Sequence, residues 1–308
     1  MKKLIIATRK SPLALWQSEF VADILRKTHH IEVDLEGFST KGDILLDSPL
    51  AKIGGKGLFT KELENAMLEN KAHLAVHSLK DVPSFLPQGL VLAALSARED
   101  DTDALLSELY KDLNALPQNA KVGTTSLRRK MQLLSLRPDL HIINLRGNVN
   151  SRLKRLKDGE FDAIILASAG VKRLGLESEV KFIYRFSKDE LVPAATQGIL
   201  GIQSPDKSEI LTLLQCLNDE KSLIESTVER DFIRTLEGGC QVPIGINAEL
   251  MGEQITVRSI LGLPDGSEIL RDKRIILKKN YQGFGERLAL EFIKRGAKEL
   301  LKRAEAML

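Results

Sequence analysis

The sequence lacks most of the features that mark a specialised class of protein. Two cysteines in 308 residues are too few for a disulfide framework or a four-ligand zinc site. Aromatic residues make up only 5% of the chain, and 45 Lys and Arg against 42 Asp and Glu leave a net charge of +3. With few rings to stack on bases and no excess of one charge, the chain is not expected to bind nucleic acid. No apolar run reaches the roughly 18 residues that a membrane span needs.

What remains is an ordinary globular composition, with 43% hydrophobic and 28% charged residues, which argues against intrinsic disorder. The apolar run Leu4–Ala7 is too short for a signal peptide, because Arg9 and Lys10 follow it at once. At roughly 150 residues per domain, the length predicts two or three domains. We therefore expect a soluble, cytoplasmic, multidomain protein with no metal and no membrane partner.

Short apolar runs alternate with helical periods over the first two thirds of the chain. The runs are 4–7, 74–77, 121–123, 142–145 and 162–167, and each is followed by a turn rich in Gly, Ser or Thr. Continuous apolar strands separated by helices predict parallel sheets covered on both faces. Ser11 is expected to cap the first helix, with Pro12 at its first position.

The last hundred residues have a different pattern, which predicts a separate α+β domain. A helix is expected over 222–236 and alternating strands over 244–250, 254–261 and 268–276, with a turn at Asp265 and Gly266. One closing amphipathic helix is expected from about 284 to 307. Because no low-complexity linker is visible, the domains are expected to be joined by short crossings around a cleft.

Arginines recur where predicted strands pass into helices. They are Arg9, Arg128, Arg129, Arg146, Arg152 and Arg173. Open α/β sheets bind ligands at the carboxyl ends of their strands, and a cation in a first helical turn opposes the helix dipole unless an anion is also held there. The set predicts a ligand with several carboxylates or phosphates. Taken singly, each arginine is equally well explained as a solvated surface charge.

Two further residues stand out by their chemistry. Asp81 follows Lys80 at a strand end, where a lone carboxylate among cations suits the stabilisation of a developing positive charge. A turn residue before Pro83 explains it equally well. Cys240 follows two glycines on a loop and is expected to be an accessible nucleophile or attachment point. Cys216 lies in an apolar helical pattern and is expected in the core.

The glycine-rich stretch 54–57 lacks the spacing of a nucleotide phosphate loop, and we expect it to be a flexible lid with Lys56 at its tip. His77 is expected to be structural rather than an acid–base catalyst.

Seven stretches spread over nearly the whole chain resemble the porphobilinogen deaminase family, also called hydroxymethylbilane synthases. They are 7–14 (ATRKSPLA), 54–59 (GGKGLF), 77–83 (HSLKDVP), 123–129 (GTTSLRR), 145–149 (LRGNV), 167–174 (ASAGVKRL) and 236–245 (LEGGCQVPIG). The last motif is highly specific.

The resemblance implies a transferase that joins four porphobilinogen molecules head to tail, releasing ammonia, to give hydroxymethylbilane in tetrapyrrole (haem) biosynthesis. It implies a dipyrromethane cofactor on a thioether at Cys240, and a catalytic role for Asp81. The implied cofactor-binding residues are Cys240, Lys80, Ser78, Thr124, Ser126, Arg128, Arg129, Arg146 and Arg152. The implied substrate-binding residues are Arg9, Ser11, Arg146, Arg152 and Arg173. The acetate and propionate groups of porphobilinogen agree with the arginine set.

The family fold implies two lobes like those of periplasmic binding proteins in a monomer. The first lobe is expected over 1–96 with a return segment 196–214, the second over 97–195, and a cofactor-attachment domain over 215–308. The sequence departs from the family at Thr196, where glycine is usual, and at Gln203, where an acid is usual. A non-catalytic carboxylate-binding protein of the same two-lobed fold is the alternative, which leaves the setting of Cys240 unexplained.

Overall fold

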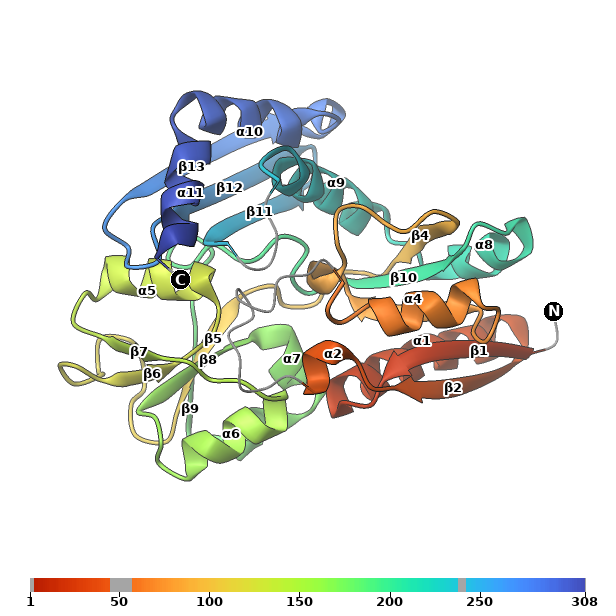
Figure 1. The fold of residues 1–308 in the computed structure, drawn as a ribbon, viewed down its shortest axis with the longest axis horizontal. Helices are drawn as coiled ribbons and strands as arrows, with labels where there is room; N and C mark the ends of the chain where they lie inside the picture. Colours follow the sequence, from red (N-terminus) through yellow and green to blue (C-terminus); the bar gives the residue numbers. More distant parts are fainter. Residues whose placement is uncertain (1–2, 45–56, 238–241, 308) are drawn as a thin grey trace. The chain divides into compact units, whose positions relative to one another are not determined.

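The computed structural model describes residues 3–44, 57–237 and 242–307, which form two units (Figure 1). Within the described chain, the first unit comprises 3–44, 57–99 and 198–223, and the second comprises 100–197, 224–237 and 242–307. The chain therefore passes between the units after Glu99, after Gln197 and within helix α9 (Glu220–Thr235).

The first unit is built on a five-stranded sheet in the order β2-β1-β3-β10-β4. Its strands are β1 (Lys3–Arg9), β2 (Glu32–Phe38), β3 (Leu74–Ser78), β4 (Leu90–Leu95) and β10 (Leu200–Pro205). Strands β1, β2 and β3 run parallel, whereas β10 is antiparallel to both of its neighbours. The return of the chain through β10 thus completes the sheet from a distant part of the sequence.

Helices cover both faces of this sheet. They are α1 (Pro12–His29), α2 (Lys41–Ile44), α4 (Lys61–Leu68) and α8 (Ser208–Leu214), with short 3-10 turns η1 (Leu79–Asp81) and η3 (Gln215–Leu217). Successive residues of β1 point to opposite faces: Leu4 and Ile6 pack under α1, and Ala7 packs under α4. Helix α1 begins as expected, because Ser11 Oγ accepts a hydrogen bond from the amide of Ala14 and Pro12 follows the cap.

The second unit contains a five-stranded sheet in the order β7-β6-β8-β5-β9. The strands are β5 (Asp103–Ser107), β6 (Lys121–Gly123), β7 (His141–Ile143), β8 (Ala163–Ala167) and β9 (Phe182–Arg185), and the helices are α5 (Leu127–Leu136), α6 (Val149–Lys157) and α7 (Ser168–Arg173), followed by the turn η2 (Leu176–Glu179). Strands β6, β7 and β8 are parallel, and β5 is antiparallel to β8 and β9.

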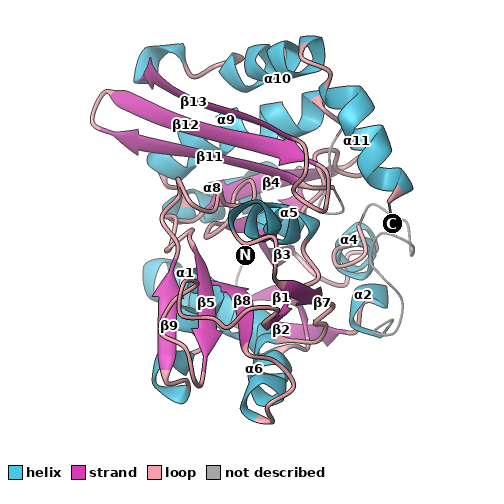
Figure 2. Cartoon of the chain, turned by 90° about the vertical axis from the view of Figure 1, so that its left-hand side faces the viewer, coloured by secondary structure: helices cyan, strands magenta, loops and turns pink. Residues whose placement is uncertain are grey.

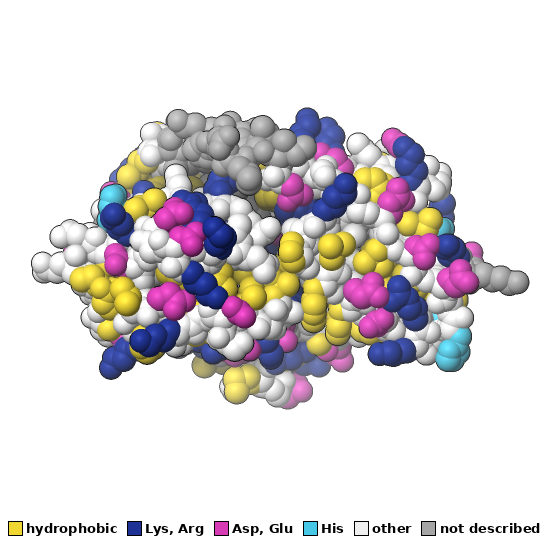
Figure 3. Space-filling model, turned by 90° about the horizontal axis from the view of Figure 1, so that it is seen from below, with side chains coloured by type: hydrophobic (Ala, Val, Ile, Leu, Met, Phe, Trp, Pro, Cys, Tyr) yellow, Lys and Arg dark blue, Asp and Glu magenta, His cyan; other side chains and the backbone are white. Residues whose placement is uncertain are grey.

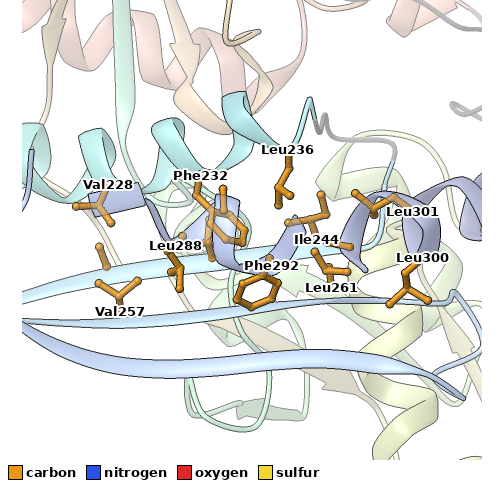
Figure 4. Close-up of a cluster of buried hydrophobic side chains, with 14 of the residues drawn as sticks. Val228, Phe232, Leu236, Ile244, Val257, Leu261, Leu288, Phe292, Leu300 and Leu301 are labelled. Atoms are coloured by element: carbon orange, nitrogen blue, oxygen red, sulfur yellow. The ribbon is translucent and has the colours of Figure 1, made fainter. Parts of the chain in front are cut away.

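The same unit carries the C-terminal antiparallel sheet of β11 (Ile244–Met251), β12 (Gln254–Gly262) and β13 (Ile269–Leu277). After the turn η4 (Lys278–Asn280), helices α10 (Phe284–Lys294) and α11 (Ala297–Ala306) pack with α9 on one face of it (Figure 2). Phe232 and Phe292 meet edge to face at the centre of this core, 5.3 Å between ring centroids (Figure 4).

The predicted fold class is confirmed: two α/β sheets with parallel strands are followed by an α+β region with an antiparallel sheet. Two local expectations were wrong. The closing helix is broken into α10 and α11, because Gly296 adopts a left-handed conformation with φ of 94°. Cys216 is exposed, because Leu214 and Leu217 take the buried positions of that turn.

The nearly equal numbers of basic and acidic residues are reflected on the surface. On the face drawn in Figure 3, basic and acidic side chains are interspersed rather than gathered by sign. Within the described part of the chain, no helix has the length and apolar character needed to cross a membrane.

Candidate active site

In the first unit, the predicted site residues gather at one edge of the sheet. Strands β1 and β3 are parallel neighbours, with Ala7 opposite Ala75, so their carboxyl ends meet. Arg9 ends β1 and Ser11 begins α1, while Ser78 ends β3 and Lys80 and Asp81 follow in η1. This is the edge at which open α/β sheets bind ligands.

Arg9 is held by a carboxylate that the sequence reasoning missed. Its Nε donates to Asp43 Oδ2 at 3.1 Å and its Nη2 pairs with Oδ1 of the same group, while its guanidinium lies 4.4 Å from the centre of the Phe59 ring. Burial alone would raise the pKa of Asp43, but the hydrogen bonds from Arg9 and Thr40 outweigh it and lower that pKa. Arg9 is thereby fixed in direction while remaining partly exposed.

The segment that carries Asp81 is anchored on both sides. Gln17 Nε2 donates to Ser78 Oγ at 2.9 Å, and the amide of Leu79 donates to the carbonyl of Ile199 at 2.9 Å. Leu79 is fully buried and Asp81 is half-buried. Among the residues that the structure describes, none forms a hydrogen bond or ion pair with the Asp81 carboxylate.

In the second unit, β6, β7 and β8 are parallel, and their carboxyl ends again collect the predicted residues. Thr124 and Ser126 lie between β6 and α5, and each hydroxyl oxygen accepts a hydrogen bond from a backbone amide. Thr124 Oγ1 accepts from the amide of Ser126 at 3.2 Å, and Ser126 Oγ accepts from the amide of Arg129 at 3.4 Å. In both bonds the hydroxyl oxygen is the acceptor, and neither hydroxyl hydrogen is donated to a residue that the structure describes.

Arg128 and Arg129 share one buried carboxylate, that of Asp103. Arg128 Nη1 donates to Asp103 Oδ2 at 2.6 Å and to the carbonyl of Val192 at 2.7 Å. Arg129 donates to Asp103 Oδ1 through Nε at 3.0 Å and Nη2 at 2.7 Å, and to the carbonyl of Ile165 through Nη1 at 2.9 Å. Burial opposes ionisation of Asp103, but the two guanidinium groups hold the pKa of its carboxyl well below the usual range.

This cluster separates two arginines that look alike in sequence. Every nitrogen of the Arg129 guanidinium donates to the protein, whereas Arg128 uses only Nη1 toward described residues. Gln132 and Gln197 complete the cluster: Gln132 Oε1 accepts the amide of Val192 at 2.7 Å, and Gln197 Nε2 donates to Asp103 Oδ1 at 3.1 Å. Toward described residues, Arg128 therefore leaves Nε and Nη2 unused, whereas Arg129 leaves one hydrogen on each Nη, so Arg128 has more donors for a ligand.

The remaining predicted arginines are half-buried. Arg152 Nε donates to the carbonyl of Gly147 at 2.8 Å, which fixes its side chain over the turn that also carries Arg146. Gly147 has φ of 111°, and a Cβ there would lie 2.3 Å from Ser151 Oγ, so the turn requires glycine. Arg173 ends helix α7 rather than beginning it.

Two sequence predictions fall outside the described residues. Cys240 lies between α9 and β11 in the segment 238–241, and the glycine-rich stretch 54–56 lies in the segment 45–56. Within the described ranges, no group of three or more His, Cys, Asp or Glu side chains is arranged to hold a metal.

Comparison with known proteins decides the family. Residues 4–212 match the model "Porphobilinogen deaminase, dipyromethane cofactor binding domain", and residues 223–294 match the C-terminal domain of the same family. The chain belongs to the porphobilinogen deaminase family. It is 72% identical over 306 residues to the porphobilinogen deaminase of Campylobacter jejuni subsp. doylei, which covers 99% of this chain and 100% of that protein. The Campylobacter lari enzyme is 66% identical over 307 residues, with 99% and 100% covered.

Among solved structures, the chain is similar to the methionine-binding protein MetQ at 12% identity, covering 72% of this chain and 92% of that one with a TM-score of 0.45. The predicted family and the predicted class of enzyme, a transferase, are confirmed by the matches to porphobilinogen deaminases.

Thr196 and Gln203, the two positions expected to depart from the family pattern, are both buried. Thr196 has φ of 59°, a left-handed conformation that glycine adopts at less cost, and its amide donates to Glu229 Oε2 at 2.5 Å. Gln203 lies on β10 and contacts His77 and Glu64. His77 is buried and hydrogen-bonded, in keeping with its expected structural role.

Proposed function

We propose that this deaminase joins four porphobilinogen molecules head to tail with release of ammonia, on a dipyrromethane cofactor bound to Cys240. The observation that carries the proposal is the donor set after β6. Arg128, Thr124 and Ser126 each keep a donor that no described residue uses, and all three follow one strand end.

This donor set fits the cofactor. A pyrrole dimer made from porphobilinogen bears acetate and propionate groups, and these carboxylates accept the hydrogen bonds that guanidinium and hydroxyl groups donate. One carboxylate beside two guanidinium groups leaves a positive charge in a nearly dry place, since Arg128 and Arg129 are 4% and 6% exposed. An anionic ligand compensates that charge. Once bound, the cofactor supplies the pyrrole to which the first substrate is joined.

Asp81 is proposed as the catalytic residue. Loss of ammonia from porphobilinogen leaves a cationic azafulvenium, and a fixed carboxylate beside it lowers the energy of the transition state. The anchoring of Ser78 and Leu79 holds the η1 turn in place. Preorganisation of this kind is typically worth about 3–4 kcal/mol in catalysis.

The other cations are proposed to bind carboxylates of the cofactor and substrates. Arg9 and Ser11 serve the substrate, Lys80 and Ser78 the cofactor, and Arg146 and Arg152 serve both as the chain grows. Arg173 is proposed for the substrate. These assignments follow from position at the strand ends and from the family motifs, since guanidinium forks bind carboxylates in pairs of hydrogen bonds.

The attachment is tested by the intact mass of the purified protein. The wild-type chain should carry an adduct of two pyrrole units, and Cys240→Ala should lose both adduct and activity while remaining folded. The second cysteine is a matched control. Cys216 is at the surface, and partial desolvation raises the pKa of its thiol, so Cys216→Ala should keep adduct and activity. A bare wild-type chain would favour the alternative, a non-catalytic carboxylate-binding protein.

We further propose a cytoplasmic monomer in which 1–96 with 196–214 forms the first lobe, 97–195 the second, and 215–308 the attachment domain. Light scattering of the loaded enzyme tests the monomer, and a mass of twice the chain would refute it.

A further inference from the structure

Three buried polar side chains form a chain of hydrogen bonds that the proposed reaction does not use. His77 Nε2 lies 3.1 Å from Gln203 Oε1, and Gln203 Nε2 donates to Glu64 Oε1 at 3.2 Å. The three residues come from β3, β10 and α4 and are 5%, 0% and 6% exposed. They lie in the layer where α4 packs on the sheet, which is otherwise lined by Ala, Leu and Met side chains. Polar groups at this depth are costly unless they are bonded to one another.

The chemistry of the groups fixes the direction of both bonds. A carboxylate only accepts, so the amide NH₂ of Gln203 faces Glu64 and its oxygen faces His77. His77 Nε2 therefore carries a hydrogen, and a neutral ring completes the chain. Burial lowers the pKa of His77 to about 4, opposed by the bond to Gln203 and assisted by Arg9. The charged groups that act on the ring are Arg9 from β1 and, beyond the amide, Glu64 from α4.

The chain of hydrogen bonds from Glu64 to His77 ends next to the turn that carries Asp81. His77 and Ser78 are the last two residues of β3, directly before the turn that carries Asp81. Side chains of successive strand residues point to opposite faces. Accordingly, His77 is tied to Gln203 and α4 on one face, and Ser78 is tied to Gln17 of α1 on the other. Two buried glutamines thus hold the end of β3 from both sides.

We propose that Gln203 is a positioning residue for Asp81: its amide ties His77 to helix α4 and, because an amide does not ionise, it holds the end of β3 in one geometry over the working pH range. The proposal rests on the proposed catalytic role of Asp81. A carboxylate at position 203 would share a proton with His77 and make the same tether depend on pH.

The test is Gln203→Glu in the cofactor-loaded enzyme. The variant keeps the size of the side chain but places a second carboxylate beside Glu64, which favours the protonated form of His77 and raises its pKa. The contact with Glu64 then needs a proton on one of the two carboxyls, because two carboxylates can only accept, so the tether should weaken as pH rises and the protons of this carboxyl pair and of His77 are lost. We expect kcat to fall by about tenfold between roughly pH 6 and pH 8.5, with KM changed by less than about twofold. The wild-type kcat should show no such loss.

A second readout does not depend on activity. The ring signals of the five histidines can be followed by NMR, and the His77 signal is identified by its absence in His77→Gln. In the wild type it should not titrate above about pH 5, and in Gln203→Glu it should titrate in the pH range over which kcat falls. His77→Gln retains a neutral donor for Gln203 and should keep kcat without a new dependence on pH.

The matched control is Gln215→Glu, the same change at an exposed position of η3, which should leave the pH profile unchanged. Identical pH profiles for Gln203→Glu and the wild type would overturn the proposal, as would a wild-type His77 that titrates near its usual pKa of 6.5. If Gln203→Glu does not fold, wild-type His77 titration and the His77→Gln profile decide the question. An inactive wild-type enzyme would refute the proposed function, while the NMR titration still tests the tether.

Discussion

At the scale of single residues, three of the arginines predicted to bind carboxylates are themselves held by carboxylates. Asp43 orients Arg9, and Asp103 orients Arg128 and Arg129. A guanidinium without such a partner would either move or be expensive to bury. Sharing one acid between two arginines fixes both side chains and still leaves a positive charge for the ligand.

Asp103→Asn should therefore damage the protein more than its small change in size suggests. The variant leaves two adjacent buried cations without a carboxylate, so the free energy of unfolding should fall by about 3–5 kcal/mol and cofactor loading should fail. Urea unfolding and intact mass measure the two effects. Asp158→Asn, at an exposed pair with Lys154, is the control and should change neither. A stable, fully loaded Asp103→Asn protein would contradict this account.

Asp81 should act through its charge rather than its shape. Asp81→Asn keeps the shape but removes the charge, so the rate of ring addition should fall by about 10²–10³-fold. Asp81→Glu keeps the charge at a shifted distance and should retain measurable activity. Single-turnover addition of one porphobilinogen to loaded enzyme compares them. Equal rates in the two variants would mean that the aspartate is only a turn residue.

At the scale of elements, features that depend on neighbouring residues could be predicted from the sequence, whereas pairings between distant residues could not. Ser11 and Ser126 predict helix starts because a cap acts within three residues. The strand ends that carry Arg9 and Asp81 follow from short apolar runs. Asp103, by contrast, lies 25 residues from Arg128, and Gln203 lies 126 residues from His77. No local pattern marks such partners, because the sheet order brings them together.

The crossing at Gly198 illustrates a local requirement set by a distant contact. Gly198 has φ of 90°, and a Cβ there would lie 2.4 Å from the carbonyl oxygen of Glu99. Gly198→Ala adds left-handed strain to this overlap, so it should destabilise the protein by about 2–5 kcal/mol. Gly175 has φ of 65° but open space around it. Gly175→Ala should therefore lower the free energy of unfolding by only about 1–2 kcal/mol. Urea unfolding of both variants would contradict this if the two losses were equal.

At the scale of the whole molecule, the hydrophobic cores differ in how much of the sequence each one needs. The core under α1 draws on residues from Leu4 to Ala94 and again from Leu200 to Leu217. Its sheet places β10 between β3 and β4. The core of the C-terminal sheet is instead built from buried residues between Ile224 and Ala304. One continuous stretch of sequence therefore supplies the buried residues of the C-terminal core, whereas the core under α1 needs two stretches that are far apart in the chain.

This difference predicts opposite behaviour for two fragments. A fragment of residues 1–99 lacks β10, so β4 has no neighbour in the sheet and Leu4, Ile6 and Val76 lose part of their cover; it should not unfold cooperatively. A fragment of residues 220–308 keeps α9, the three-stranded sheet and both closing helices, and should unfold as one cooperative unit in urea. Among the described residues it loses the packing of Ile260 against Met131 and Val192, together with polar contacts at its edge such as the ion pairs of Glu249 with Lys188 and of Arg258 with Asp189. Circular dichroism during urea titration measures both, and a cooperative 1–99 fragment beside an unfolded 220–308 fragment would reverse the argument.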